Sequence, residues 1–98
     1  MAQFDVRQAA SGELVVDCQA DLLDSLPTRY VIPLYRRSEA DWVFSRLTPT
    51  LAFRGETYTL ATPLGGAIDI EELGKPLGSL AYERYTILNA IDFLLAGV

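Results

Sequence analysis

The sequence predicts an α+β domain that is mainly β-structure in its first two thirds and ends in one carboxyl-terminal helix. Polar and apolar residues alternate over residues 3–7 and again over residues 14–20, as in half-buried strands. Near the carboxyl end, apolar residues instead recur every three to four positions, which is typical of an amphipathic helix. No linker, repeat or low-complexity segment divides the 98 residues. We therefore expect a single domain spanning residues 1–98.

Two strands joined by the turn residues Ser11 and Gly12 are expected at the amino end. In the second strand, residues 14, 16, 18 and 20 share one face. Cys18 is therefore predicted to be a small core residue rather than a reactive thiol. Asp17 and Gln19 are predicted to point away from the core.

Residues 21–28 are expected to form a loop, although Leu22, Leu23 and Leu26 within it are apolar. These leucines either fold back onto the core, which we favour, or form part of a contact surface. Residues 29–34 are then predicted to form a strand, and Pro33 places the end of that strand at a sheet edge or bulge.

A hairpin is the best-defined feature of the middle of the chain. Residues 50–53 and 57–60 favour strands and flank a connection that contains Gly55. Residues 42–47, which include the single Trp42, fit either a strand or an irregular crossing. The remaining expectations are a loop at 36–41, an interruption of the sheet at 62–66, a short strand at 67–70 and a loop at 71–78.

The helix is predicted to follow Ser79, a plausible N-cap, with Glu83 in its first turn complementing the helix dipole. About 17 residues would make it roughly 25 Å long. It runs almost to the apolar terminus, which either docks into the core or is held ready for a partner. Its apolar stripe consists of Leu80, Ile87, Leu88, Ile91, Leu94 and Leu95.

Composition and charge exclude several classes of function. The net charge of −5 argues against direct nucleic-acid binding, which needs a basic surface. The chain contains no histidine and a single cysteine, which argues against histidine-based catalysis and cysteine-based metal sites. No signal peptide and no apolar run long enough to cross a membrane is evident. A cytoplasmic protein with a basic partner is the simplest interpretation.

Four segments in order resemble the CcdB toxins of toxin–antitoxin modules. The amino-terminal strand, the second strand with its aliphatic pair between two aspartates, a Val-Ile-Pro-Leu strand and the closing helix each match that family's pattern. The matching segments are Gln3-Phe4-x-Val6, Leu14-x-Val16-Asp17-x-Gln19-x-Asp21-Leu22-Leu23-Asp24, Arg29-x-Val31-Ile32-Pro33-Leu34 and Asn89-Ala90-Ile91 followed by Gly97-Val98.

The resemblance implies a small SH3-like antiparallel β-barrel of the kind shared by CcdB, MazF and Kid. It also implies a homodimer with the carboxyl-terminal helices near its two-fold axis. CcdB toxins bind the A subunit of DNA gyrase and trap the covalent cleavage complex, without a catalytic site, a metal or a cofactor of their own. A CcdA-type antitoxin neutralises them by wrapping a disordered segment around the toxin.

The family's gyrase contact carries over to Ala96, Gly97 and Val98. Gly97 is retained and Val98 is a conservative replacement for isoleucine, but Ala96 stands where the family has tryptophan. Loss of such an aromatic anchor commonly costs 2 kcal/mol or more, or about thirtyfold in affinity.

The family's antitoxin surface carries over to the leucine pair and to two helix positions. Asp92 replaces an asparagine and adds a negative charge there. Antitoxin recognition is therefore expected to be better preserved than gyrase poisoning. The four positions are Leu22, Leu23, Asp92 and Leu95.

Three functions follow from the sequence: a gyrase poison, an antitoxin-binding homologue with weakened poisoning, and a ribonuclease like MazF. A ribonuclease would need arginine and hydroxyl side chains in a basic groove, and the acidic net charge disfavours such a groove. Its only candidates are Arg29, Arg36 and Arg37 with Thr28 or Ser38.

Overall fold

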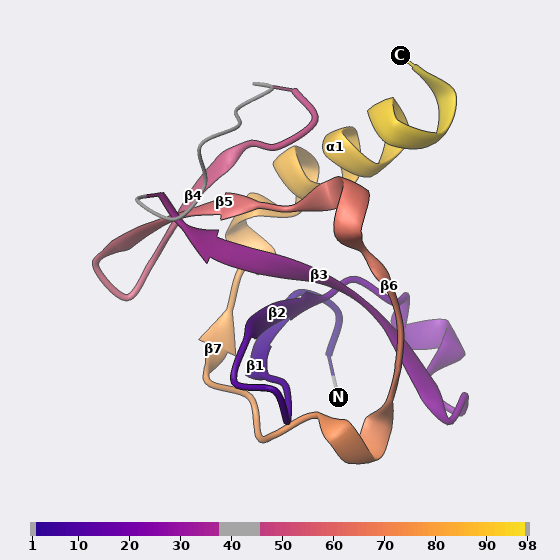
Figure 1. The fold of residues 1–98 in the computed structure, drawn as a ribbon. Helices are drawn as coiled ribbons and strands as arrows, with labels where there is room; N and C mark the ends of the chain where they lie inside the picture. Colours follow the sequence, from indigo (N-terminus) through magenta and orange to yellow (C-terminus); the bar gives the residue numbers. More distant parts are fainter. Residues whose placement is uncertain (1, 38–45, 98) are drawn as a thin grey trace.

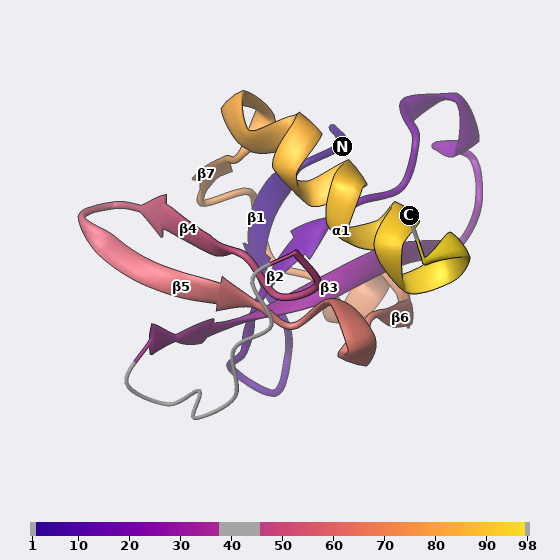
Figure 2. The ribbon, with the colours of Figure 1, turned by 90° about the horizontal axis from the view of Figure 1, so that it is seen from above.

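The computed structural model describes residues 2–37 and 46–97. These residues form a curved antiparallel sheet, a half-barrel, with the helix α1 (Arg84–Ala96) lying across its open side (Figures 1 and 2). The predicted class, mainly β with a carboxyl-terminal helix, is confirmed. The strands are β1 (Asp5–Gln8), β2 (Leu14–Asp17), β3 (Thr28–Arg36), β4 (Thr50–Phe53), β5 (Glu56–Leu60), β6 (Gly66–Asp69) and β7 (Gly78–Ser79). The 3-10 turns are η1 (Asp21–Leu23), η3 (Thr62–Leu64), η4 (Ile70–Glu72) and η5 (Ala81–Glu83).

Strand β3 is the centre of the sheet, whose order is β4-β5-β3-β2-β1-β7. One edge of β3 pairs with β2, and the other pairs first with β6 and then with β5. The predicted strand over residues 29–34 is confirmed, but it continues beyond its predicted end at Leu34 to Arg36. The carbonyl of Pro33 accepts a hydrogen bond from Ala61 N–H at 2.9 Å. Along β3, pairing with β6 ends at Val31 and pairing with β5 begins at Leu34. Pro33 lies between the two, so its missing N–H costs no ladder bond.

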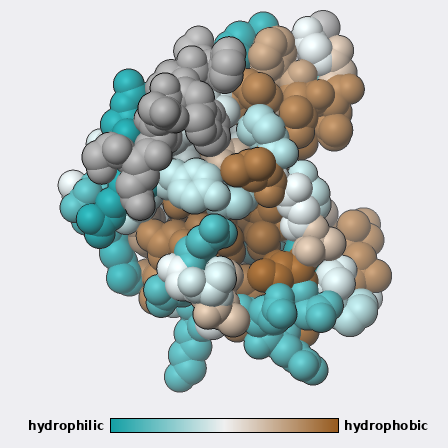
Figure 3. All heavy atoms as spheres, in the orientation of Figure 1, coloured by the Kyte–Doolittle hydropathy of each residue, from teal (hydrophilic) through white to brown (hydrophobic). Residues whose placement is uncertain are grey.

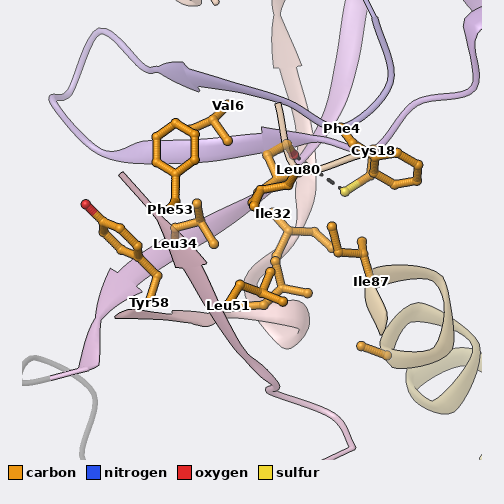
Figure 4. Close-up of a cluster of buried hydrophobic side chains, with 13 residues drawn as sticks. Phe4, Val6, Cys18, Ile32, Leu34, Leu51, Phe53, Tyr58, Leu80 and Ile87 are labelled. Carbon is orange, nitrogen blue, oxygen red and sulfur yellow. Dashed lines mark hydrogen bonds between the residues drawn. The ribbon is translucent and has the colours of Figure 1, made fainter. Parts of the chain in front are cut away.

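The core lies between the concave face of the sheet and the first half of α1 (Figure 4). Ile87 and Ala90 of α1 are fully buried there, together with Leu80 just before η5. Cys18 belongs to the same cluster, which confirms its prediction as a core residue. Other buried members are Phe4, Val6, Val16, Ile32, Leu34, Leu51, Phe53, Tyr58 and Leu60.

The predicted hairpin between β4 and β5 is confirmed. Phe53 pairs with Glu56, and the two-residue turn places Arg54 at φ 51° and Gly55 at φ 79°. Positive φ at both central residues is the signature of a type I′ turn, whose twist matches that of the strands.

Helix α1 begins later than predicted and has 13 residues. Ser79 pairs in β7, and Leu80 N–H donates to the carbonyl of Phe4 at 2.8 Å. These backbone groups are committed to the sheet, so helical structure starts only at Ala81. The Ser79 hydroxyl accepts the N–H of Ala81, the first residue of η5, at 3.1 Å. Contrary to the prediction, Ser79 is not the N-cap of α1; that position is Glu83.

The outer face of the amino-terminal strands is covered, contrary to the expected polar exterior. Arg7, Asp17 and Gln19 point away from the main core but are buried. Arg7 Nη1 donates to the Gly74 carbonyl at 2.6 Å, because the chain after η4 folds back over β1. The alternation of polar and apolar residues predicted correctly that these side chains point away from the main core. It did not predict that other segments of the chain would bury them.

Two expectations fall wholly or partly outside the described residues. Trp42 lies there, with most of the expected crossing at 42–47 and part of the expected loop at 36–41. Within the residues that are described, no helix is long and apolar enough to cross a membrane.

Candidate partner-binding surface

Helix α1 is divided into a buried first half and an exposed carboxyl end. Ile87 is 0 % exposed, whereas Leu94 is 39 % and Leu95 is 79 % exposed. Figure 1 shows the last turns of α1 standing away from the sheet. Of the two possibilities for the apolar terminus, docking into the core is therefore excluded for its described part. Asp92, Ala96 and Gly97 are exposed as well, and Val98 lies outside the described residues.

Gly97 ends the helix by a change of backbone conformation. Its φ is 74°, in the left-handed region, and its N–H donates to the carbonyl of Phe93 at 2.9 Å. A glycine adopts this conformation without the steric penalty of a Cβ atom. On the same turn, the Arg46 guanidinium lies 4.6 Å from the centre of the Phe93 ring. The helix end thus has a defined geometry although it is exposed.

The leucines of η1 and the residues after it form a second exposed apolar site. We call residues 21–26 the leucine loop. Leu22 is 92 % exposed, and Leu23 and Leu26 are about half exposed. The favoured expectation that they pack on the core is wrong. Polar groups, not an apolar pocket, lie beneath this loop.

Those polar groups are a buried ion pair. Arg29 Nε and Nη2 donate to the two carboxylate oxygens of Asp17 at 2.7 and 3.0 Å. Arg29 Nη1 donates to Asp24 Oδ1 of the leucine loop at 2.8 Å. The Arg29 and Asp17 side chains are both 0 % exposed. The hydrogen bond to Asp17 is the main cause that raises the pKa of Arg29, so the guanidinium stays charged.

The ion pair bears on the arginines that the sequence suggested for a ribonuclease. Arg29 is enclosed by carboxylates and cannot reach an RNA strand, whereas Arg36 and Arg37 lie on the surface. Ser38 falls outside the described residues.

Burial first, and the charge of Asp17 second, raise the pKa of the Cys18 thiol to about 12. The thiol is thus protonated at neutral pH and inert as a nucleophile.

The leucine loop and the carboxyl end of α1 lie on the same side of the molecule in both ribbon views (Figures 1 and 2). Figure 3 shows hydrophobic atoms gathered along that side, at the end of α1 and again at η1. Beside the helix, η3 packs against α1 and exposes Leu64. We call this set the leucine face. Its members are Leu22, Leu23, Leu26, Leu64, Leu94 and Leu95.

The leucine face combines exposed leucines with exposed aspartates. Asp21, Asp24 and Asp92 are exposed on the same elements and give it an acidic rim. No cluster of histidine, cysteine, aspartate or glutamate suited to a metal ion occurs among the described residues. Apolar patches with polar rims are typical of protein–protein contacts. Leu22 and Leu23 lie on the leucine loop, and Asp92, Leu95, Ala96 and Gly97 lie on the last turns of α1 and at its end; all six are exposed.

Sequence reasoning missed a hollow on another part of the molecule. Its volume is about 660 Å³, and its lining includes Gln8, Glu13, Tyr35, Arg36 and Arg54. These residues come from the β1–β2 turn, the end of β3 and the β4–β5 hairpin. No local pattern marks such a hollow, because it forms only when the three segments meet.

Comparison with known protein families adds an independent finding. The family model described as CcdB protein matches residues 3–97 of this chain. The match includes both the leucine loop and the described end of α1.

Proposed function

The chain belongs to the CcdB family, the toxins of toxin–antitoxin modules, and on this premise we propose that it poisons DNA gyrase. In this proposal the carboxyl end of α1 binds the gyrase A subunit and traps the covalent gyrase–DNA cleavage complex. The chain itself performs no catalysis. A CcdA-type antitoxin neutralises it by covering the leucine face.

The observation that carries the proposal is the exposed apolar end of α1. Leu95 is 79 % exposed, and Ala96 and Gly97 follow it at the surface. Exposed leucines at a helix end gain nothing for the fold but contribute strongly when a partner desolvates them. Gly97 ends the helix in a fixed backbone geometry, so little conformational entropy remains to be lost on binding.

The antitoxin is proposed to cover the leucine face, including Leu95 at the gyrase-binding end of α1. Leu22 and Leu23 supply the apolar contacts at one end, and Leu95 with Asp92 supplies the other. The acidic rim and the net charge of −5 favour a partner segment that alternates apolar and basic residues. In a homodimer whose carboxyl-terminal helices lie near the two-fold axis, two such faces would lie close to each other.

A capture experiment tests the gyrase contact. The purified breakage domain of the gyrase A subunit is bound to the wild-type chain, to Leu95→Asp and to Tyr85→Ala. Tyr85 is 75 % exposed but lies at the opposite end of α1, so its variant is the matched control. We expect Leu95→Asp to abolish capture and Tyr85→Ala to leave it unchanged.

Expression in growing cells tests the activity. The expected result is growth arrest with DNA damage, relieved by co-expression of a CcdA-type antitoxin or by gyrase mutations at the gate. Normal growth with intact DNA at toxin-equivalent expression would refute the proposal for this chain.

A second candidate, an antitoxin-binding homologue with weakened poisoning, is favoured by Ala96. This exposed alanine offers little surface where the family's tryptophan would bury about 150–250 Å². If Ala96→Trp restores strong gyrase capture to a weakly binding wild type, only the anchor has been lost. No gain from Ala96→Trp would mean that the surrounding surface has diverged too.

A further inference from the structure

The leucine loop is attached to the fold through polar contacts at several of its residues. At its start, Asp21 Oδ1 accepts the backbone N–H of Gln3 at 2.8 Å. In its middle, the Leu23 carbonyl accepts the side-chain amide of Gln19 at 2.8 Å. Apolar packing of the loop is incomplete, because Leu22 is 92 % exposed and Leu23 and Leu26 are about half exposed. Polar contacts therefore determine where the leucines lie.

The innermost of these contacts is the one between Asp24 and Arg29. Arg29 is itself held by both oxygens of Asp17, and neither side chain of that pair is exposed. The guanidinium is thus a fixed point, and its remaining nitrogen Nη1 reaches Asp24 at 2.8 Å. A charge-assisted hydrogen bond to a fixed donor defines the position of its acceptor.

The fold does not require Asp24 for charge balance. Asp17 already neutralises Arg29 within the buried pair, whereas the Asp24 side chain is 53 % exposed. Without Asp24, water can reach Nη1 from the solvent side. The second carboxylate, that of Asp24, is therefore better explained by its effect on the loop than by its effect on the core.

We propose that Arg29 is a positioning residue which, through Asp24, holds the leucine loop in the conformation that binds the antitoxin. This inference rests on the proposed function of that loop. A 3-10 turn of three residues is not stable in isolation. Fixing it in the free protein means that its ordering is complete before the partner arrives, which raises affinity without adding a contact.

The test uses Asp24→Ala, which removes the acceptor, and Asp24→Asn, which keeps a neutral one. Asp69→Asn is the control, because Asp69 is an exposed aspartate paired with Thr28 just after the loop. Amide hydrogen exchange of residues 21–26 reports on the loop without any partner. We expect exchange there to be fastest in Asp24→Ala, intermediate in Asp24→Asn and unchanged in Asp69→Asn, with β3 protected in all three.

Affinity is measured with a labelled peptide from the carboxyl-terminal segment of a CcdA antitoxin. Asp24→Ala is expected to weaken binding by about three- to tenfold, as it would if the competent loop conformation fell to roughly a third to a tenth of the population. Asp24→Asn should recover part of the loss. Unchanged exchange or unchanged affinity in Asp24→Ala would overturn the proposal.

A thermodynamic cycle separates positioning from direct contact. In a Leu22→Ala background, a purely positioning Asp24 should lose most of its effect on peptide affinity. A full, additive effect that disappears at high salt would instead mean that Asp24 contacts a basic partner directly, and it would refute the positioning role. If Leu22→Ala alone leaves affinity unchanged, the loop is not an antitoxin site, and both the proposed function of the loop and this inference fail.

Discussion

Ile87→Ala and Leu95→Ala should have opposite effects on stability and on partner binding. Both replace a branched aliphatic residue of α1 with alanine, and both sites are in the same helix. Ile87 is 0 % exposed, whereas Leu95 is 79 % exposed. The two variants therefore test directly whether α1 divides into a structural half and a binding end.

The magnitude follows from what each side chain buries. Ile87→Ala removes three carbons, which is about 2.4 kcal/mol at about 0.8 kcal/mol for each buried methylene. The cavity left behind raises the loss to about 3–4 kcal/mol. In a 98-residue chain this lowers Tm by about 12–32 °C. Leu95→Ala should change the free energy of unfolding by less than about 0.5 kcal/mol but weaken gyrase binding by about 1–2 kcal/mol, or about five- to thirtyfold.

Thermal unfolding followed by circular dichroism gives the first quantity, and titration with the gyrase A-subunit breakage domain gives the second. Unfolding is recorded at two protein concentrations, since a loss of self-association depends on concentration and a loss of core packing does not. If Leu95→Ala lowers Tm as much as Ile87→Ala at both concentrations, the helix end is part of the core, and the reasoning is refuted.

Three further predictions concern the interior. Arg29→Ala should cost about 3–5 kcal/mol in chemical denaturation because it leaves a buried carboxylate uncompensated; a loss below about 1 kcal/mol would contradict this. Burial raises the pKa of the Cys18 thiol from 9.0 to about 12. As pH rises from 9 to about 12, the wild type should therefore lose stability relative to Cys18→Ala, by at most about 1.4 kcal/mol per pH unit. Parallel curves of stability against pH for the two proteins would refute the burial argument. Gly78→Ala would place a Cβ 2.7 Å from the Phe53 ring and should cost about 1–3 kcal/mol, whereas Gly66→Ala, with nothing within 4 Å, serves as the control and should be tolerated.

Local patterns predicted the elements well but their limits less well. Alternation identified the strands, and the glycine-bearing connection identified the hairpin, because both signals depend on neighbouring residues alone. The helix started late because Leu80 N–H is bonded to the carbonyl of Phe4. That bond joins residues far apart in sequence and has no local signature. The same is true of Pro33, whose tolerance depends on where β6 ends and β5 begins.

The candidate site was only partly accessible to sequence reasoning. The resemblance pointed to Leu22, Leu23 and the helix end, but hydrophobicity alone pointed Leu22 and Leu23 inward. Apolar residues are found at the surface often enough that hydrophobicity does not predict burial one residue at a time. The ion pair of Asp17 and Arg29 was hidden for a different reason. Only the register of β2 against β3 brings the two side chains together.

The closure of the fold has a consequence for biosynthesis. Strand β1 pairs with β7, and Phe4, in the buried cluster, receives the N–H of Leu80. A segment that leaves the ribosome much later therefore completes the pairing of β1. A nascent chain cannot close its core before α1 has emerged. The leucine face, which is the proposed binding surface, is therefore assembled only once α1 has left the ribosome.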